Sequence, residues 1–202
     1  MADNELLHLA PGKIANVITY LQIVGKPDWT QTRSSHPGLI LIQNRAFDLD
    51  QYRALFREVG EKWLWSSRLR SDDVQLSIQI HAANVELFEV MFEGAVVGMV
   101  ELCRHSPENI ELSFFGLKPQ FTGKGLGRDL MQLTLNHAWT AETRKLWLHT
   151  CTFDHPAALK FYQACGFRPT GFAVEIMDDP RLLGLLPKTA GAHIPLLTPD
   201  TA

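Results

Sequence analysis

The chain has 202 residues, 46% of them apolar and 20% charged, and a formal net charge of −3, which suits one packed domain. It has no run of Lys and Arg, no secretion signal and no apolar run that could cross a bilayer, which argues against nucleic acid and membranes as partners. The three cysteines, Cys103, Cys151 and Cys165, form no CxxC pair, so we expect a reducing, cytoplasmic compartment.

The first part of the chain alternates between strand and helix patterns. Residues 14–24 are rich in β-branched side chains and predict a strand, and residues 39–44 predict a second one. From Asp50 the apolar residues recur at helical spacing up to Gly60, which we expect to end the helix. Ser71 is placed to cap a second helix that begins directly after it.

The rest of the chain predicts a β-meander followed by alternating helices and strands. The expected strands are residues 85–92, 96–103, 110–117, 145–152 and 172–177. Helices are expected from Leu126 to Trp139 and from Asp154 to about Cys165, and the tail beyond the last strand shows neither pattern. This order implies an α/β fold of the α+β kind, with a mixed, mostly antiparallel sheet flanked by helices.

A glycine-rich turn lies between the strand that ends at Leu117 and the helix that begins at Leu126. Gly123, Gly125 and Gly127 let the backbone turn tightly and direct successive N–H groups outward. The helix N-terminus adds about half a positive charge, so the turn can seat a phosphate. Its spacing differs from GxxxxGK[ST] and from GxGxxG, which disfavours a nucleotide hydrolase and a dinucleotide-binding domain.

Two motifs in the chain resemble those of the GNAT superfamily of N-acetyltransferases. The segment TGKGLG, 122–127, occupies the family pattern [RQ]-x-x-G-x-[GA], and ALKFYQACGF, 158–167, is similar to the family's second signature. The resemblance covers about residues 39–177 of a single domain spanning 1–202, and leaves an extra N-terminal strand and the C-terminal tail outside. It implies a GNAT-like fold and a metal-free enzyme that uses acetyl-CoA.

The resemblance also implies that acetyl-CoA binds at the glycine turn. A backbone N–H near Leu117 would polarise the thioester carbonyl. Thr122 stands where the family usually has Arg or Gln, and His155 where it often has Asn, so single contacts to the pyrophosphate and the pantetheine arm are expected to differ. The residues expected to bind the cofactor are Leu117, Thr122, Gly123, Lys124, Gly125, Leu126, Gly127, Arg128 and His155.

Amide formation from a thioester needs a base for the amine and an acid for the departing thiolate. By resemblance, Glu111 is the expected base and Tyr162 the expected acid. Glu111 is otherwise a solvent-facing strand residue, and Tyr162 a core residue of an amphipathic helix. Glu101 is the second choice of base, Glu86 the third, and an ordered water is a further alternative.

The acceptor is predicted to be a small-molecule amine that attacks directly in a ternary complex. Trp63 and Trp65 are expected to border its pocket, or else to anchor a loop by packing. His149, Cys151 and His155 have no recognised metal spacing, so neither a metal nor an acyl-cysteine is expected. A non-catalytic acyl-CoA-binding module and a protein lysine or N-terminal acetyltransferase are the alternatives. A homodimer is a further expectation.

Overall fold

The computed structural model describes residues 6–27 and 35–198 of the chain. Within them, seven strands form one sheet in the order β2-β3-β4-β5-β6-β1-β7. Neighbouring strands are antiparallel except β5 and β6, which run parallel. The predicted mixed, mostly antiparallel sheet is confirmed.

The elements follow the predicted chain order. The strands are β1 (Lys13–Val24), β2 (Ile40–Gln43), β3 (Val85–Phe92), β4 (Ala95–Ser106), β5 (Asn109–Leu117), β6 (Lys145–Cys151) and β7 (Arg168–Asp178). The helices are α1 (Leu49–Gly60), α2 (Asp73–Ile80), α3 (Leu126–Ala138) and α4 (Ala158–Ala164), with 3₁₀ turns over Glu61–Trp63 and Pro119–Phe121. None of the helices in the described ranges is long and apolar enough to span a membrane.

Two helix starts differ from the prediction. Asp72, not Ser71, caps α2, because its carboxylate accepts the N–H of Gln75. α4 begins four residues later than predicted, at the start of its motif. The physical reason is that Asp154 closes the preceding turn by accepting the N–H of Cys151, so the backbone there is not yet helical.

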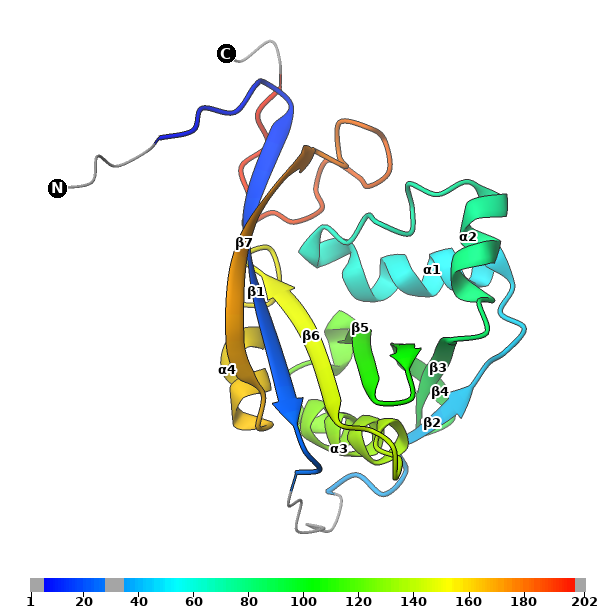
Figure 1. Ribbon diagram of the computed structural model, residues 1–202. Coiled ribbons are helices and arrows are strands. Elements are labelled where there is room, and N and C mark those ends of the chain that lie inside the picture. The colour runs from blue at the N-terminus through cyan, green and yellow to red at the C-terminus, as the bar shows by residue number, and fades with distance from the viewer. Residues whose placement is uncertain (1–5, 28–34, 199–202) are drawn as a thin grey trace, which may run out of the picture.

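Two apolar clusters fill the two faces of the sheet. Successive strand residues divide between them, as the pleat requires. Leu87 and Met99 pack with α1 and α2, whereas Phe88 and Val100 pack with α3. The sheet therefore separates a layer of α1, α2 and the C-terminal tail from a layer of α3 and α4, and α4 lies behind the strands in Figure 1.

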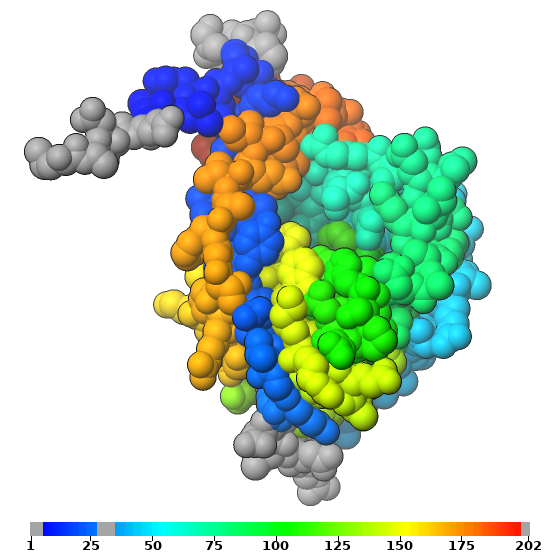
Figure 2. Space-filling model, viewed as in Figure 1, coloured from blue at the N-terminus to red at the C-terminus, as the bar shows by residue number. Residues whose placement is uncertain are grey.

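The N-terminal strand is an internal strand of the sheet. β1 pairs with β6 over residues 18–24 and with β7 over residues 13–22, so it runs between them in Figures 1 and 2. Ile14 belongs to the cluster on the α1/α2 side. Asn16, two residues further along the strand, therefore faces the same side.

The parallel strands β5 and β6 separate after a short ladder. The structure describes every residue of both strands, and only residues 109–111 of β5 pair with residues 145–147 of β6. Ser113 forms a bulge against β4, and a bulge bends its strand. Beyond the ladder the backbone edges of β5 and β6 face a gap, and this gap positions the candidate site.

Candidate active site

A cavity of about 490 Å³ is present at the gap between β5 and β6. Its walls come from both layers of the fold. The α3/α4 layer contributes the glycine turn and α4, the α1/α2 layer contributes the segment that follows α1, and β1 and β7 contribute inward-facing side chains. A volume of this size suits a small-molecule ligand.

The glycine turn presents free amide groups at the start of α3. Gly123 and Gly125 have φ angles of +75° and +85°, a left-handed conformation that favours glycine. The N–H groups of Gly123, Lys124 and Gly125 donate no hydrogen bond within the described ranges, and all three residues are exposed. Leu126, the next residue, is buried in the core. The turn is therefore a cradle of donors suited to an anion.

The polar side chains of the turn are placed unequally. Thr122 lines the cavity together with Gly127, but its Oγ1 donates to the carbonyl of Pro119 at 2.7 Å. Lys124 and Arg128 are solvent-exposed beside the turn and do not line the cavity. Backbone amides rather than the Thr122 hydroxyl are thus the groups available to a phosphate at this end.

Tyr162 lines the cavity from α4. Its ring packs against those of Phe115, Phe161 and Phe167, so it is also part of the core. Burial raises the pKa of Tyr162 far above its usual value, and the carboxylate of Asp154 raises it further. Its hydroxyl has no hydrogen-bond partner in the described part of the chain. The phenol is therefore protonated at neutral pH and free to donate.

Asp154 and His155 shape the loop before α4, and both line the cavity. The carboxylate of Asp154 accepts from Thr150 Oγ1 at 2.7 Å and from Trp65 Nε1 at 3.2 Å. His155 Nδ1 accepts the N–H of Ala157 at 3.0 Å, within the turn that precedes α4. The histidine at this position therefore orders the loop that leads into α4.

Trp63 and Trp65 line the cavity and are packed at the same time. Trp65 lies against the ring of Phe114, and Trp63 lies 5.1 Å from the ring of His155 and 5.7 Å from that of His193, between ring centres. His193 belongs to the C-terminal tail, which therefore supports the Trp63 side of the cavity.

Comparison with known protein families assigns this chain to one of them. Residues 50–167 match the model of the acetyltransferase (GNAT) family, which is more than half of the chain. The chain belongs to the GNAT acetyltransferase family. No curated protein sequence gives a significant match.

Solved structures share the GNAT fold. A conserved protein of unknown function from Staphylococcus epidermidis matches with a TM-score of 0.56 and 16% identity, over 83% of this chain and 63% of its own length. A putative GNAT acetyltransferase from Novosphingobium aromaticivorans matches with a TM-score of 0.52 and 19% identity, over 82% and 67%. A GNAT acetyltransferase from Elizabethkingia anophelis with acetyl-CoA bound matches with a TM-score of 0.51 and 19% identity, over 67% and 79%. The chain thus spans less than two thirds of the first of these structures, and the likeness confirms the fold.

Neither of the two preferred glutamates lines the cavity of this GNAT chain. Glu111 lies in the short β5–β6 ladder before the gap, and its carboxylate is 2.8 Å from His105 Nε2. Glu101 is fully buried and accepts from the Tyr52 hydroxyl and from Arg68. Burial raises the pKa of Glu101, and the Arg68 charge opposes this shift only in part. The base role of Glu111 stays a prediction that this placement does not support.

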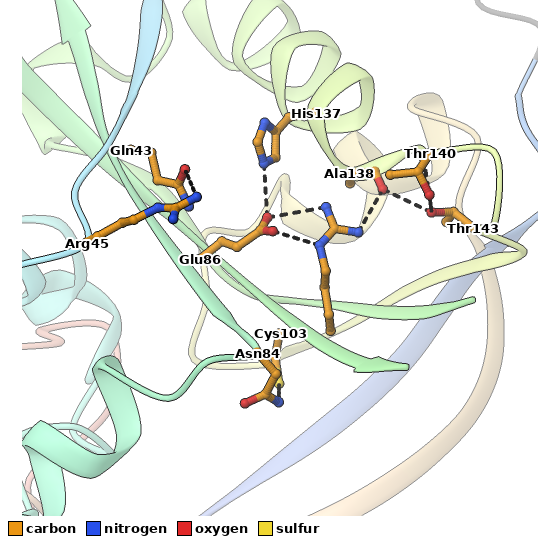
Figure 3. Close-up of polar contacts among 10 residues, drawn as sticks. Gln43, Arg45, Asn84, Glu86, Cys103, His137, Ala138, Thr140 and Thr143 are labelled. Atoms are coloured by element: carbon orange, nitrogen blue, oxygen red, sulfur yellow. Dashed lines mark hydrogen bonds and ion pairs between the residues drawn. The ribbon is translucent and has the colours of Figure 1, made fainter. Parts of the chain in front are cut away.

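Glu86, the third candidate base, is bound on the α3 side of the sheet. It accepts from Arg104 Nε at 2.7 Å and from His137 Nε2 at 2.9 Å (Figure 3). Arg104 also donates to the carbonyl of Ala138 at the end of α3. Burial acts to raise the pKa of Glu86, but these hydrogen bonds outweigh it and the pKa is lowered. Glu86 therefore ties β3 to α3 and does not line the cavity.

Several polar residues of the cavity wall had no role in the sequence-based site or only a disfavoured one. Asn16, Arg70 and Glu175 line the cavity, and so does His149, which the sequence suggested only as a disfavoured metal ligand. Asn16 carried a usable signal, because it is the polar residue at an inward position of the alternating pattern in β1.

The structure also bears on two disfavoured alternatives, a cysteine nucleophile and a metal site. Burial is the main cause that raises the pKa of Cys151 to about 11, which disfavours a thiolate nucleophile. Across residues 6–27 and 35–198, no three His, Cys, Asp or Glu side chains are grouped so that they could hold a metal ion.

Proposed function

We propose that this chain transfers an acetyl group from acetyl-CoA directly to the amine of a small molecule in a ternary complex. The observation that carries the proposal is one cavity shared by the glycine turn, Tyr162 and the gap between β5 and β6. The free amides of the turn would bind the pyrophosphate. The unpaired edges of β5 and β6 would receive the pantetheine arm, and the acceptor would enter from the α1/α2 layer.

The chemistry assigns one role to each part of the cavity. The amine nitrogen attacks the thioester carbonyl, a C–N bond forms, and the C–S bond breaks to release the thiolate of coenzyme A. A backbone N–H near Leu117, which lines the cavity, would stabilise the oxyanion. Tyr162 would give its proton to the thiolate, because its phenol is held protonated.

The proton of the amine needs an acceptor inside the cavity, and we assign this role to His149. It is exposed, lines the cavity and lies on the part of β6 beyond the ladder with β5. Its neighbour Leu148 packs in the α3 cluster, so His149 faces the α1/α2 side, where the acceptor would enter. Imidazole is the side chain that most often transfers protons in enzymes. A cytoplasmic setting and a homodimer stay predictions.

The proposal is tested by the thermal unfolding midpoint with and without saturating acetyl-CoA. A ligand at about 100 times its Kd adds roughly 2.7 kcal/mol, which for a domain of this size raises the midpoint by about 5 to 11 °C. Adenosine alone should give no such rise. An unchanged midpoint with acetyl-CoA would overturn the proposal.

The glycine turn is tested with Gly125→Val. The φ of +85° disfavours any side chain, and a Cβ would lie 3.3 Å from the His36 ring, so we expect the variant to lose the rise caused by acetyl-CoA. Gly184→Val is the matched control, because Gly184 has a φ of +71° but lies in the tail with open space around it. A normal response of Gly125→Val would contradict phosphate binding at the turn.

A further inference from the structure

β1 and β7 bring a polar pair to the wall of the cavity. Asn16 lies directly opposite Glu175 in the ladder between the two strands, and both side chains line the cavity. Asn16 Nδ2 donates to Glu175 Oε2 at 2.8 Å. Asn16 is 3% exposed, and its Oδ1 is buried and accepts no hydrogen bond in the described ranges. A buried acceptor without a donor is unfavourable, so a donor that reached this atom from the cavity would bind favourably.

The hydrogen bond between the two side chains fixes the orientation of the amide. If the amide were rotated, its oxygen would face the carboxylate, and two acceptors would meet without a donor. The pair therefore offers Asn16 Oδ1 and the carboxylate of Glu175, which are acceptors and carry a negative charge. A primary ammonium complements them, because it has three N–H donors, no acceptor and a positive charge.

The pair is offset from the gap where acetyl transfer would take place. Ile18 pairs with Cys151 at the end of β6, and Asn16 lies two residues further along β1. Two residues of an extended strand span about 6.6 Å. A group bound by Asn16 and Glu175 therefore lies beyond the end of β6, displaced along β1 from the gap.

The reacting amine is a poor partner for this carboxylate. It must be neutral when it attacks, whereas contact with a carboxylate favours the protonated ammonium. We infer that the acceptor is an aliphatic diamine, whose second, non-reacting ammonium binds Asn16 and Glu175 while its other amine reaches the gap. This inference rests on the proposed function and names the acceptor class of the same cavity.

Arg70 supports a competing class of acceptor, one with a negative charge at its far end. Among the described residues it is the one Lys or Arg that lines the cavity. Its Nη2 donates to the backbone carbonyl of Asp178 at 2.8 Å, and the carboxylate of Asp178 pairs with Lys13 at 2.6 Å. An acceptor with a carboxylate at its far end would use Arg70 instead of Glu175, so the test must separate the two charges.

Three acceptors with five carbons each make this separation: 1,5-diaminopentane, pentylamine and 5-aminopentanoate. We expect kcat/KM at saturating acetyl-CoA to be higher for the diamine than for pentylamine by about tenfold or more. Glu175→Gln should reduce this ratio to about one through the KM of the diamine. Glu175 is exposed, so the substitution should preserve the fold. Glu142→Gln removes an exposed carboxylate outside the cavity and should keep the preference.

The outcomes test the diamine inference and the proposed function separately. Equal use of the diamine and pentylamine, or a preference that survives Glu175→Gln, overturns the inference, and so does a preference for 5-aminopentanoate. If none of the three is acetylated, calorimetry measures their binding to the CoA-bound protein, and equal or absent binding overturns it as well. The midpoint rise with acetyl-CoA is measured on the same samples. Its presence leaves the proposed function standing, and its absence removes the proposed function itself.

Discussion

Burial and the charge of Asp154 both disfavour the phenolate of Tyr162 and raise its pKa above the usual value. Tyr162→Phe keeps the ring and its contacts with Phe115 and Phe161 but removes the proton donor. We expect kcat to fall by about 10²- to 10⁴-fold, with an unchanged midpoint rise on adding acetyl-CoA. Steady-state kinetics and thermal unfolding measure the two quantities. A normal kcat would exclude Tyr162 as the proton donor.

His149 and Glu111 make opposite predictions for the pH dependence of kcat/KM. His149 lines the cavity and Glu111 does not. We expect His149→Gln to lower kcat/KM by about 10²-fold below pH 8 and to recover partly at higher pH, where more of the amine is already neutral. Glu111→Gln should leave the profile unchanged. If the effects of the two variants were exchanged, Glu111 would be the base.

At the scale of helices and strands, the packing of α1 on β5 depends on Gly116. A Cβ at Gly116 would lie 2.4 Å from Val59 Cγ1 and 3.2 Å from the Trp65 ring. Val59 has a stiff β-branched side chain on α1 and cannot easily move. We expect Gly116→Ala to lower the free energy of unfolding by about 1 to 3 kcal/mol.

Gly171→Ala is the matched control for this packing. Gly171 also lies in a strand, but a Cβ there would meet only Tyr20, at 4.0 Å. Urea unfolding of both variants should show a loss for Gly116→Ala and little change for Gly171→Ala. Equal losses would mean that the cost reflects alanine in a strand and not the approach of α1.

The order of the elements and the glycine turn were predictable because their signals are local. The partners of a strand are not, since pairing joins residues that are distant in sequence. Nothing in residues 14–24 indicates that this strand lies between β6 and β7. The bulge at Ser113 and the end of the β5–β6 ladder also depend on the assembled sheet. For this reason the sequence could not show that Glu111 stops short of the cavity.

The candidate site, too, could be predicted from the sequence only where its signals are local. The glycine turn and Tyr162 each belong to a local motif, and the structure brings both to one cavity. Asn16 was recognisable as an inward polar residue, but its partner Glu175 is 159 residues away in the sequence. No local pattern connects the two, so this wall of the cavity could be described only from the folded sheet.

At the scale of the whole molecule, the C-terminal tail is fixed by a buried ion pair. The side chains of Arg181 and Asp179 are each 1% exposed and lie 2.7 Å apart. Arg181 also donates to the carbonyls of Ala190, Ile194 and Pro195. One guanidinium thereby holds a segment that has no helix or strand to satisfy its backbone, and this segment carries His193 to the side of Trp63.

Removing the carboxylate of this pair should unfold more than the tail. Asp179→Ala leaves Arg181 buried without its countercharge, so we expect the free energy of unfolding to fall by about 3 to 5 kcal/mol. Asp178→Ala is the matched control on the adjacent residue, because that carboxylate forms a half-exposed pair with Lys13 and should contribute far less. Urea unfolding followed by tryptophan fluorescence measures the free energy of unfolding of both variants. Equal losses in the two variants would contradict a tail anchored by Asp179, whereas a loss confined to Asp179→Ala would show that the buried pair stabilises the whole fold.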